Sequence, residues 1–357
     1  MGTQKNHGYK IAVVGATGAV GRELFEILED RKFPVAELRP FASARSEGRI
    51  LHLNEKPYRC TAMTKGCFDG IDIAFFDASD EVSEEWALHA AEAGAWVIDN
   101  SATYRLDPEV SLVVPEVNGK ELSGLSNSTP KGKARIIAGP NCTTVQLVVA
   151  LKPIHEKWGI KRIVVSTYQS TSGAGTAAMD ELSAQTAAMF NQKSLPAKVF
   201  SHQIAFNCIP QIGGFKDDGY TSEEQKVVNE TRKIMGLPKL KVSVTAVRVP
   251  TFSCHGESVN IECEKPFSVE EVRAALGAQD GVILLDDPSK QIYPMNVTGE
   301  GDPVEGATGN DAVYVGRIRK DTSVENGLNL WVVSDNLRKG AALNAVQIAE
   351  TLIKILN

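Results

Sequence analysis

Residues 10–21 of the chain read KIAVVGATGAVG, and this stretch decides the fold of the first part of the sequence. Lys10–Val14 is a short, largely β-branched run typical of a buried strand, and three glycines follow it with the spacing G-x-x-G-x-x-G. Apolar residues then recur at helical spacing from Val20 to Leu28, so the glycines lie in a strand-to-helix turn. Glycine lets such a turn bend tightly and approach a pyrophosphate, which the start of a helix attracts. The pattern predicts a dinucleotide site, and the alternative is a turn that is merely tight.

The loop after the second expected strand, Glu37–Phe41, favours a cofactor with an additional phosphate. In dinucleotide-binding folds a carboxylate near this position holds the ribose 2′-hydroxyl of NAD. Here the loop offers Ser43, Arg45 and Ser46 instead. An arginine and hydroxyls suit the 2′-phosphate of NADP through charge-assisted hydrogen bonds. The alternative is an exposed polar loop without a ligand.

Strands and helices continue to alternate up to residue 99. Residues 71–76 and 96–99 are expected strands, with an expected helix at residues 82–93 between them. This alternation predicts a parallel, Rossmann-like sheet with helices on both faces. Loops at the carboxyl ends of such strands line the ligand crevice, so residues 78–79 and 100–105 are candidate site segments. Arg105, in the second of these, is either an anion ligand or a surface cation.

A further strand-to-helix turn places a cysteine at the start of a helix. Residues 134–138 form an expected strand and Gly139–Thr144 form the turn. The apolar helix follows, and we expect it to weaken near Pro153, which lacks a backbone N–H. The start of a helix favours negative charge, so a thiol at Cys142 is biased toward the nucleophilic thiolate. The alternative is a small buried hydrophobe, which free cysteine often is.

The remainder of the chain predicts a second domain with a mixed or antiparallel sheet. The expected strands cover residues 162–169, 242–248, 259–263, 313–319 and 328–334. Gln169 ends the first of these strands, where it either orients a carbonyl group or is a satisfied edge glutamine. After the expected N-cap at Thr221, Glu223 and Lys226 lie three residues apart and share one helical face. A surface ion pair is the simple alternative for them.

Arg248 and His255 complete the candidate catalytic set. Arg248 continues the apolar strand face of residues 242–246, where a guanidinium is costly to bury unless it meets an anion. A carboxylate would pair with it in a bidentate fork. His255 lies in the loop expected before residue 259, and histidine is the usual proton carrier beside a nucleophilic cysteine. The other histidines are interpreted as surface or packing residues: His7, His52, His89, His155 and His202.

The composition narrows the class of protein. With 357 residues, 43% of them hydrophobic and 23% charged, the chain suits two ordinary globular domains. A net charge of -6 gives no reason to expect nucleic acid or a membrane surface as a partner, and no apolar run approaches the roughly 20 residues of a membrane span. The six cysteines are expected to be reduced, and without a C-x-x-C pair no metal site is expected. Because Met1–Tyr9 has no secretory segment, we expect the cytoplasm, or a plastid if a transit peptide has been removed.

Together these stretches resemble those of aspartate-β-semialdehyde dehydrogenases, from about Lys10 to Leu356. The likeness rests on Gly15–Gly21, Pro140–Thr144, Ser166–Gln169 with Ser172–Gly175, Arg248–Pro250 before His255, and Arg338–Ala342. It implies a Rossmann-like NADP-binding domain over residues 1–141, completed by residues 337–357. An α+β catalytic and dimerisation domain is expected over residues 142–336, with the C-terminal helix returning to the first domain.

The resemblance also implies an activity: NADPH and L-aspartyl 4-phosphate give L-aspartate 4-semialdehyde, NADP and inorganic phosphate, on the route to lysine, threonine and methionine. By position, Cys142 matches the nucleophile of the family, His255 its acid/base and Gln169 its orienting amide. The matching substrate residues are Arg248 for the carboxylate, Glu223 for the ammonium group, and Arg105, Asn141 and Lys226 for phosphate. The matching cofactor residues are Gly15, Thr17, Gly18, Ala19, Val20, Ser43, Arg45, Ser46, Ser172, Gly173 and Asn336. The family also implies a homodimer or homotetramer.

The chain departs from the family pattern at two places, and two other functions are alternatives. Phe76–Asp80 replaces a more usual Ser-Ala-Gly-Gly-like loop and adds two carboxylates beside the expected cofactor path, and Thr143 stands where serine is commoner. The nearest rival is an N-acetylglutamyl-phosphate reductase, whose acetylated substrate has no charge for Glu223 to pair with. Another is a cofactor-binding regulator without chemistry, which the complete set of catalytic candidates opposes.

Overall fold

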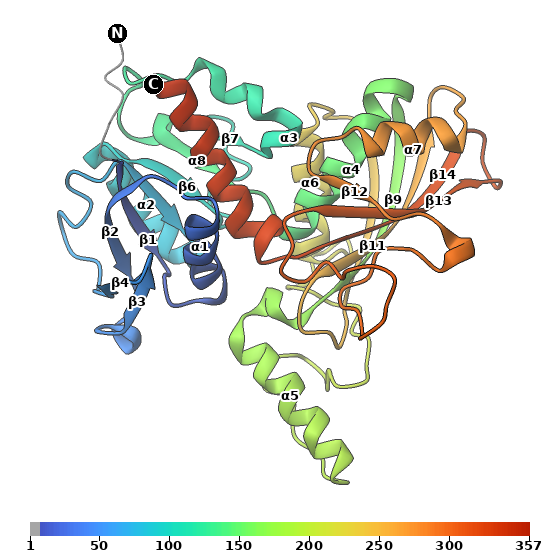
Figure 1. Cartoon of the computed structure of the whole chain (residues 1–357), viewed down its shortest axis with the longest axis horizontal. Coiled ribbons are helices and arrows are strands. Elements are labelled where there is room, and N and C mark those ends of the chain that lie inside the picture. The colour runs from blue at the N-terminus through green and yellow to red at the C-terminus, as the bar shows by residue number, and fades with distance from the viewer. Residues whose placement is uncertain (1–7) are drawn as a thin grey trace. The chain divides into compact units, whose positions relative to one another are not determined.

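The computed structural model describes residues 8–357, which divide into two compact units. Unit 1 runs to Asn141 and also includes Ala341–Asn357, whereas unit 2 comprises Cys142–Gly340. Figure 1 shows the last helix, in red, beside the blue N-terminal elements of unit 1. His7 lies outside the described residues.

Unit 1 is built on a six-stranded sheet of order β2-β1-β5-β6-β8-β7, in which every pairing is parallel. Its strands are β1 (Tyr9–Val14), β2 (Val35–Phe41), β5 (Ile73–Phe76), β6 (Trp96–Asp99), β7 (Ser111–Leu112) and β8 (Ile136–Ala138). Its helices are α1 (Ala19–Asp30), α2 (Asp80–Ala93), α3 (Pro115–Asn118) and α8 (Leu343–Leu356), and β3 (Ile50–Leu53) and β4 (Lys56–Arg59) form a separate hairpin. The predicted Rossmann-like sheet is confirmed.

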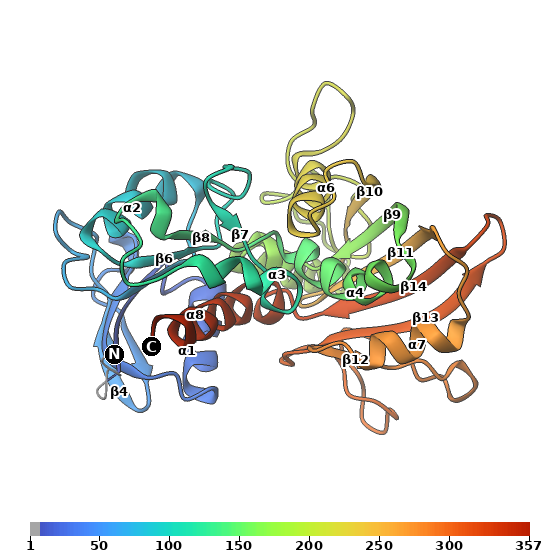
Figure 2. The same ribbon diagram turned by 90° about the horizontal axis from the view of Figure 1, so that it is seen from above.

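Helices cover both faces of this sheet, with α2 on one side and α1 and α8 on the other (Figure 2). Leu24 and Leu28 of α1 share one hydrophobic core with Ile11 of β1 and with Val346 and Leu352 of α8. Burial of these side chains is the main favourable contribution that fixes α8 on unit 1. The predicted return of the C-terminal helix to the first domain is therefore confirmed.

The strand order reverses beside β1, because the chain passes from β1 to β2 on one side and to β5 on the other. Gly15 begins the turn after β1 at φ +83°, and a side chain there would overlap the carbonyl group of Asp77, which follows β5. Doubly wound sheets bind their ligands at such a reversal. The reversal therefore coincides with the glycine turn that the sequence predicts as a dinucleotide site.

Unit 2 is built on a second six-stranded sheet, of order β10-β9-β11-β14-β13-β12. Its strands are β9 (Ile160–Gln169), β10 (Lys241–Arg248), β11 (His255–Cys263), β12 (Val282–Leu284), β13 (Val313–Asp321) and β14 (Gly327–Ser334). Its helices are α4 (Cys142–Trp158), α5 (Thr176–Phe190), α6 (Ser222–Ile234) and α7 (Val269–Gly277). The outer pairs are parallel and the three central pairs antiparallel, so the sheet is mixed, as predicted.

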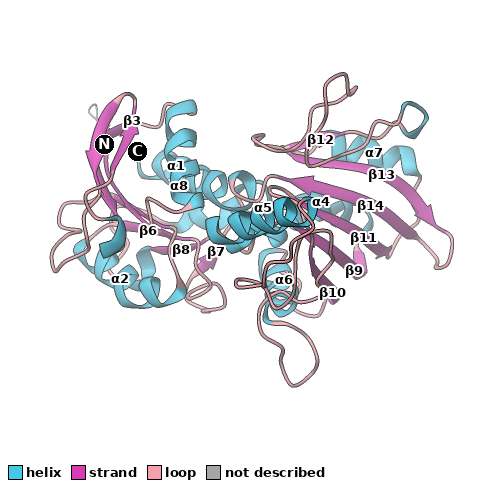
Figure 3. Cartoon of the chain, turned by 90° about the horizontal axis from the view of Figure 1, so that it is seen from below, coloured by secondary structure: helices cyan, strands magenta, loops and turns pink. Residues whose placement is uncertain are grey.

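One face of this second sheet is covered by α4, α6 and α7, which contact the strands beneath them, and α4 contacts both α6 and α7. Figure 3 shows the strands side by side from β12 to β10. Along β11, Val259 and Ile261 are buried whereas Ser258 is exposed, because alternate side chains of a strand point to opposite faces. Helix α4 therefore packs on an apolar sheet face, and the other face carries more polar side chains.

Two local sequence-based expectations are wrong. Helix α4 does not weaken at Pro153 but continues to Trp158. Pro153 forfeits one helix hydrogen bond, and burial of Pro153 and its neighbour Ile154 offsets that loss. Residues 134–135 belong to the 3-10 turn Lys133–Arg135, and the strand begins only at Ile136.

Several features of other protein classes are missing from residues 8–357. No helix in this range has the length and apolar character to cross a membrane. Within the same residues, no group of three His, Cys, Asp or Glu side chains is placed to hold a metal ion. Nor does any disulfide join the cysteines of the described chain.

Candidate active site

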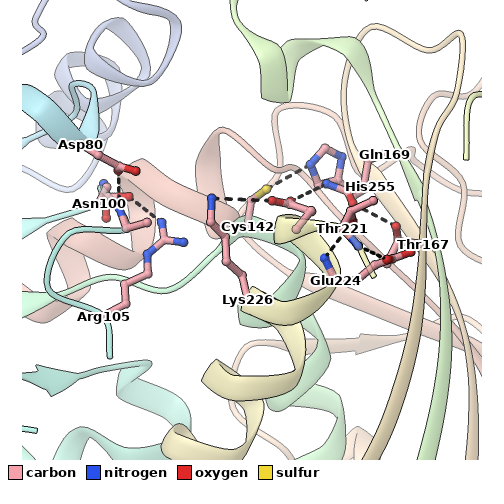
Figure 4. Close-up of polar contacts among 12 residues, drawn as sticks. Asp80, Asn100, Arg105, Cys142, Thr167, Gln169, Thr221, Glu224, Lys226 and His255 are labelled. Atoms are coloured by element: carbon pink, nitrogen blue, oxygen red, sulfur yellow. Dashed lines mark hydrogen bonds and ion pairs between the residues drawn. The ribbon is translucent and has the colours of Figure 1, made fainter. Parts of the chain in front are cut away.

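The sulfur of Cys142 lies 3.1 Å from Nε2 of His255 (Figure 4). Cys142 is the first residue of α4 and His255 the first residue of β11. His255 is not the loop residue that the sequence predicts, because it pairs with Gln169 of β9 and Ser334 of β14. The start of a helix and the start of a strand thus bring together the predicted nucleophile and its predicted proton carrier.

The ring of His255 is held in one tautomer. The backbone N–H of Ser170 donates to Nδ1 over 3.1 Å, so the neutral ring carries its proton on Nε2. Burial, with the nearby positive charge of Arg248, lowers the pKa of His255 to about 3, so the ring is neutral at physiological pH. Nε2–H then donates toward the sulfur of Cys142, which suits a thiolate at the positive start of α4.

Arg248 ends β10 with its guanidinium group buried, as the strand pattern predicts. Its Nη1 donates to the carbonyl oxygen of Ser170 over 2.5 Å, which uses one of five N–H groups. Burial lowers the pKa of Arg248, and negative charge on Glu223 and Cys142 opposes that shift. Arg248 also lines a pocket of about 230 Å³ together with Ile212 and neighbouring side chains.

Gln169, Glu223 and Lys226 form a polar cluster in the same unit. Nε2 of Gln169 donates to Glu223 over 3.0 Å, and its Oε1 accepts from the hydroxyl of Thr167 over 2.9 Å. Nζ of Lys226 lies 3.9 Å from the second carboxylate oxygen of Glu223. Glu223 is only 8% exposed, so this is not the surface ion pair that its spacing also allowed. The neighbouring capping box of Thr221 and Glu224 is the local signal that starts α6 here.

The candidate cofactor residues of unit 2 also come together. Nδ2 of Asn336 donates to the hydroxyl of Ser172 over 3.0 Å, and both side chains are buried. A Cβ on Gly173 would come within 3.3 Å of Nε2 of His255 and 3.2 Å of Nη1 of Arg248. Glycine at this position therefore keeps the polar atoms of the site uncovered.

Two residues contribute to this site that the sequence does not reveal. The N–H of Ser170 fixes the tautomer of His255, and a backbone group leaves no pattern in the sequence. Gly340 packs against the nucleophile, since a Cβ there would come within 2.9 Å of Cβ of Cys142. The resemblance marks Arg338–Ala342 as a matching stretch without giving Gly340 this role.

The candidate cofactor residues of unit 1 fit a dinucleotide. Gly18 is the N-cap of α1, and no side chain caps this helix, so its first N–H groups face no competing side-chain acceptor. A Cβ on Gly21 would overlap the carbonyl oxygen of Gly15, so these glycines allow a close backbone approach. After β2, Ser43 precedes a 3-10 turn that contains the exposed Arg45.

Arg105 in unit 1 is not a surface cation. It is 7% exposed and donates from Nε to the carbonyl of Gly139 over 2.9 Å and from Nη2 to the carbonyl of Asn100 over 2.6 Å. Figure 4 shows the contact with Asn100. Arg105 thereby ties the loop after β6 to the turn that holds Asn141, which is also buried.

Asp77 lies in the loop where the chain departs from the family pattern. Its Oδ1 accepts from Nδ2 of Asn100 over 2.6 Å, while its Oδ2 is buried without a hydrogen-bond partner among residues 8–357. Burial raises the pKa of Asp77 to about 7; the amide of Asn100 opposes the shift and the charge of Asp99 adds to it. Asp77 therefore changes its charge near neutral pH.

Replacement of Asp77 by asparagine is expected to reduce the dependence of stability on pH. In the folded protein the carboxyl group of Asp77 keeps its proton up to about pH 7, whereas the ordinary pKa of an aspartate side chain is 3.8. The native state then binds more protons, so ionisation of Asp77 lowers the free energy of unfolding as pH rises from about 4 to about 7. Urea unfolding at about pH 5 and about pH 8 measures the difference. The parent protein should lose more stability than Asp77→Asn, and equal losses would contradict the assignment.

Comparison with known proteins places this geometry in a family. The family model described as semialdehyde dehydrogenase, NAD binding domain, matches residues 10–125, and the semialdehyde dehydrogenase dimerisation domain matches residues 151–339. An aspartate-semialdehyde dehydrogenase of Aquifex aeolicus is 52% identical and covers 97% of this chain and 98% of its own. The crystal structure of aspartate semialdehyde dehydrogenase II complexed with ASA, from Vibrio cholerae, has a TM-score of 0.90 and 47% identity, over 97% of this chain and 98% of its own.

A nucleotide-binding sheet followed by a dimerisation domain defines the class as the semialdehyde dehydrogenases. Within that class, the identity and coverage of its relatives show that the chain belongs to the aspartate-semialdehyde dehydrogenase family. The family and enzyme class that the sequence predicts are confirmed.

Proposed function

We propose that the protein catalyses the reversible conversion of L-aspartyl 4-phosphate and NADPH to L-aspartate 4-semialdehyde, NADP and phosphate. Relatives at about half identity over nearly the whole chain support this reaction. The structural observation that carries the proposal is the contact of 3.1 Å between Cys142 and His255, with Arg248 close to both. In such a site the guanidinium group of Arg248 can hold a carboxylate while the sulfur of Cys142 attacks an acyl carbon.

Cys142 is the proposed nucleophile. Its thiolate attacks the acyl carbon of the acyl phosphate; the S–C bond forms, and the bond to the phosphate oxygen breaks with its electron pair. The product is a thioester on Cys142. The nicotinamide cofactor supplies the hydride that this thioester accepts. The resulting alkoxide expels the thiolate as the aldehyde forms, and the reverse reaction requires phosphate to attack the thioester.

Substrate binding at Arg248 is proposed to prepare His255 for proton transfer. The charge of Arg248 is one cause of the low pKa of His255. A substrate carboxylate on Arg248 offsets that charge and raises the proton affinity of the ring. His255 then accepts and returns a proton beside the sulfur, as general acid–base catalysis requires.

The remaining polar groups divide between substrate and cofactor. Glu223 is proposed to hold the ammonium group of the substrate, and Gln169 to orient its carbonyl group. The residues proposed to hold phosphate are Arg105, Asn141 and Lys226. The exposed guanidinium of Arg45 favours NADP over NAD because it can pair with the 2′-phosphate. Gly15, Ser43, Ser46, Ser172, Gly173 and Asn336, with residues 17–20, complete the proposed cofactor site.

A phosphate-dependent assay tests this function. The protein is incubated with aspartate semialdehyde and phosphate, with NADP and NAD in parallel, and the reduced cofactor is followed by absorbance. We expect reduction that requires phosphate and is faster with NADP. Reduction at the same rate without phosphate would contradict the acyl-phosphate chemistry.

Glu223 separates the proposed substrate from an N-acetylated one. Because the charged ammonium group would lose its ion-paired partner, Glu223→Gln should raise the KM for aspartate semialdehyde by about tenfold to a hundredfold. The parent should turn over N-acetylglutamate semialdehyde poorly, and the variant should not worsen that turnover. Steady-state kinetics with both aldehydes decide this point. Efficient use of the acetylated aldehyde by the parent would favour the N-acetylglutamyl-phosphate reductase alternative.

The protein is proposed to act as a homodimer or homotetramer. The dimerisation-domain match covers most of unit 2. Tyr168 of β9 is 40% exposed and lies 5.3 Å, ring to ring, from Trp331 of β14. An exposed aromatic side chain such as that of Tyr168, packed on the half-buried Trp331, is typical of surfaces that a second copy covers.

A further inference from the structure

Gln146 is a buried polar residue on the apolar helix that carries the nucleophile. It follows Cys142 by four residues in α4, and because residues four apart lie on one helical face, it lies one turn below the sulfur. Its neighbours Val145 and Leu147 are apolar, and Gln146 itself is 0% exposed. A buried amide costs stability unless its polar atoms find partners, so its contacts indicate what it does.

The amide of Gln146 binds two neighbouring strands at the level of His255. Its Nε2 donates to the backbone carbonyl of His255 over 3.2 Å. Its Oε1 accepts from the hydroxyl of Ser334 over 2.6 Å. Ser334 is the residue of β14 that lies opposite His255 of β11 in the antiparallel register. One side chain therefore connects the nucleophile helix to the strand of the histidine and to the strand beside it.

A carboxyl group next to this amide is buried as well. Glu257 follows His255 by two residues, points to the same face of β11 and is 0% exposed. Burial raises the pKa of Glu257 well above its usual range, and the amide of Gln146 only partly opposes that rise. Burial therefore favours the neutral, protonated form of the Glu257 carboxyl group beneath the catalytic pair.

We propose that Gln146 is a positioning residue that sets the distance between the sulfur of Cys142 and Nε2 of His255, an inference that rests on the proposed function. Helix α4 packs on the sheet mainly through apolar side chains, and such contacts are non-directional. Hydrogen bonds are directional, so the two bonds of the Gln146 amide select one register of the helix on the sheet. A shift of the helix would lengthen the 3.1 Å contact on which the thiolate depends.

Alkylation of the thiol tests this inference without substrate or cofactor. Gln146→Leu keeps the approximate volume and removes both hydrogen bonds. We expect iodoacetamide to alkylate Cys142 about tenfold more slowly at neutral pH, because the thiolate loses an aligned donor. In the proposed reaction, kcat should fall by up to about a hundredfold with little change in KM.

Gln185→Leu is the matched control. Gln185 of α5 is 2% exposed and its Oε1 accepts from the backbone N–H groups of Ile204 and Ala205, so the variant also removes a buried amide. In Gln185→Leu, Cys142 should react with iodoacetamide at the parent rate, even if the melting temperature of this variant falls as much as that of Gln146→Leu. Should Gln146→Leu fail to fold, Ser334→Ala removes only the bond of 2.6 Å and should slow alkylation to a smaller extent.

The inference is overturned if folded Gln146→Leu, or Ser334→Ala in its place, reacts with iodoacetamide at the parent rate. It is also overturned if Gln185→Leu slows alkylation equally. These outcomes differ from failure of the proposed function, in which the parent protein itself would not oxidise aspartate semialdehyde. A fully active parent with unchanged thiol reactivity in the variants would remove Gln146 alone from the account.

Discussion

Replacement of Cys142 by alanine is expected to lower kcat for phosphate-dependent NADP reduction by at least about ten thousandfold. The reason is that no other group within the site can form the thioester, so the reaction loses its covalent intermediate. Binding of NADPH should survive, because the proposed cofactor residues do not include Cys142. Single-turnover kinetics and fluorescence titration of NADPH measure the two effects separately.

Cys208→Ser is the control for this variant. Cys208 is an exposed cysteine in the same unit, and its backbone N–H donates to the side chain of Asn207. Its substitution should leave kcat and NADPH affinity at their parent values. Equal turnover in Cys142→Ala and the parent would remove Cys142 from the mechanism, and the functional proposal would then need a different nucleophile.

Replacement of His255 by asparagine has the second largest expected effect. The variant loses the donor that faces the sulfur at 3.1 Å and the group that transfers the proton. Loss of a positioned acid or base typically costs a hundredfold to ten thousandfold, so kcat should fall by about that range. Because His255 makes no proposed contact with the substrate carboxylate, KM should change far less. Steady-state kinetics with aspartate semialdehyde measure both constants.

His202→Asn provides the comparison for that measurement. His202 is exposed, which agrees with the sequence-based interpretation of this histidine as a surface or packing residue. The substitution should leave both kinetic constants unchanged. A His255→Asn variant with the kcat of the parent would show that another group moves the proton.

Sequence patterns predict the parts of this site that a single strand, turn or helix forms by itself. The turn at Gly15–Gly21 and the turn before Cys142 are each a strand, a glycine-containing loop and a helix in succession, so periodicity and glycine spacing suffice to find them. Arg248 is found for a similar reason, because a strand alternates its faces and a charged side chain on the buried face needs an explanation.

The parts that the sequence does not predict depend on contacts between distant segments. The N–H of Ser170 on His255, the packing of Gly340 on Cys142 and the amide of Gln146 against Ser334 each join residues more than 80 positions apart. No local period encodes such pairs. The sequence also does not predict that α4 continues through Pro153. Burial of this part of the helix against distant segments outweighs the low helix propensity of proline.

Peptide mass spectrometry of the acyl-enzyme tests the central claim most directly. The protein is mixed with aspartate semialdehyde and NADP without phosphate, quenched in acid and digested, because the thioester should accumulate when nothing attacks it. The account predicts a gain of one aspartyl group on the peptide that contains Cys142, and its loss when phosphate is added. Turnover in the presence of phosphate without any such adduct, or with the adduct on a different residue, would contradict it.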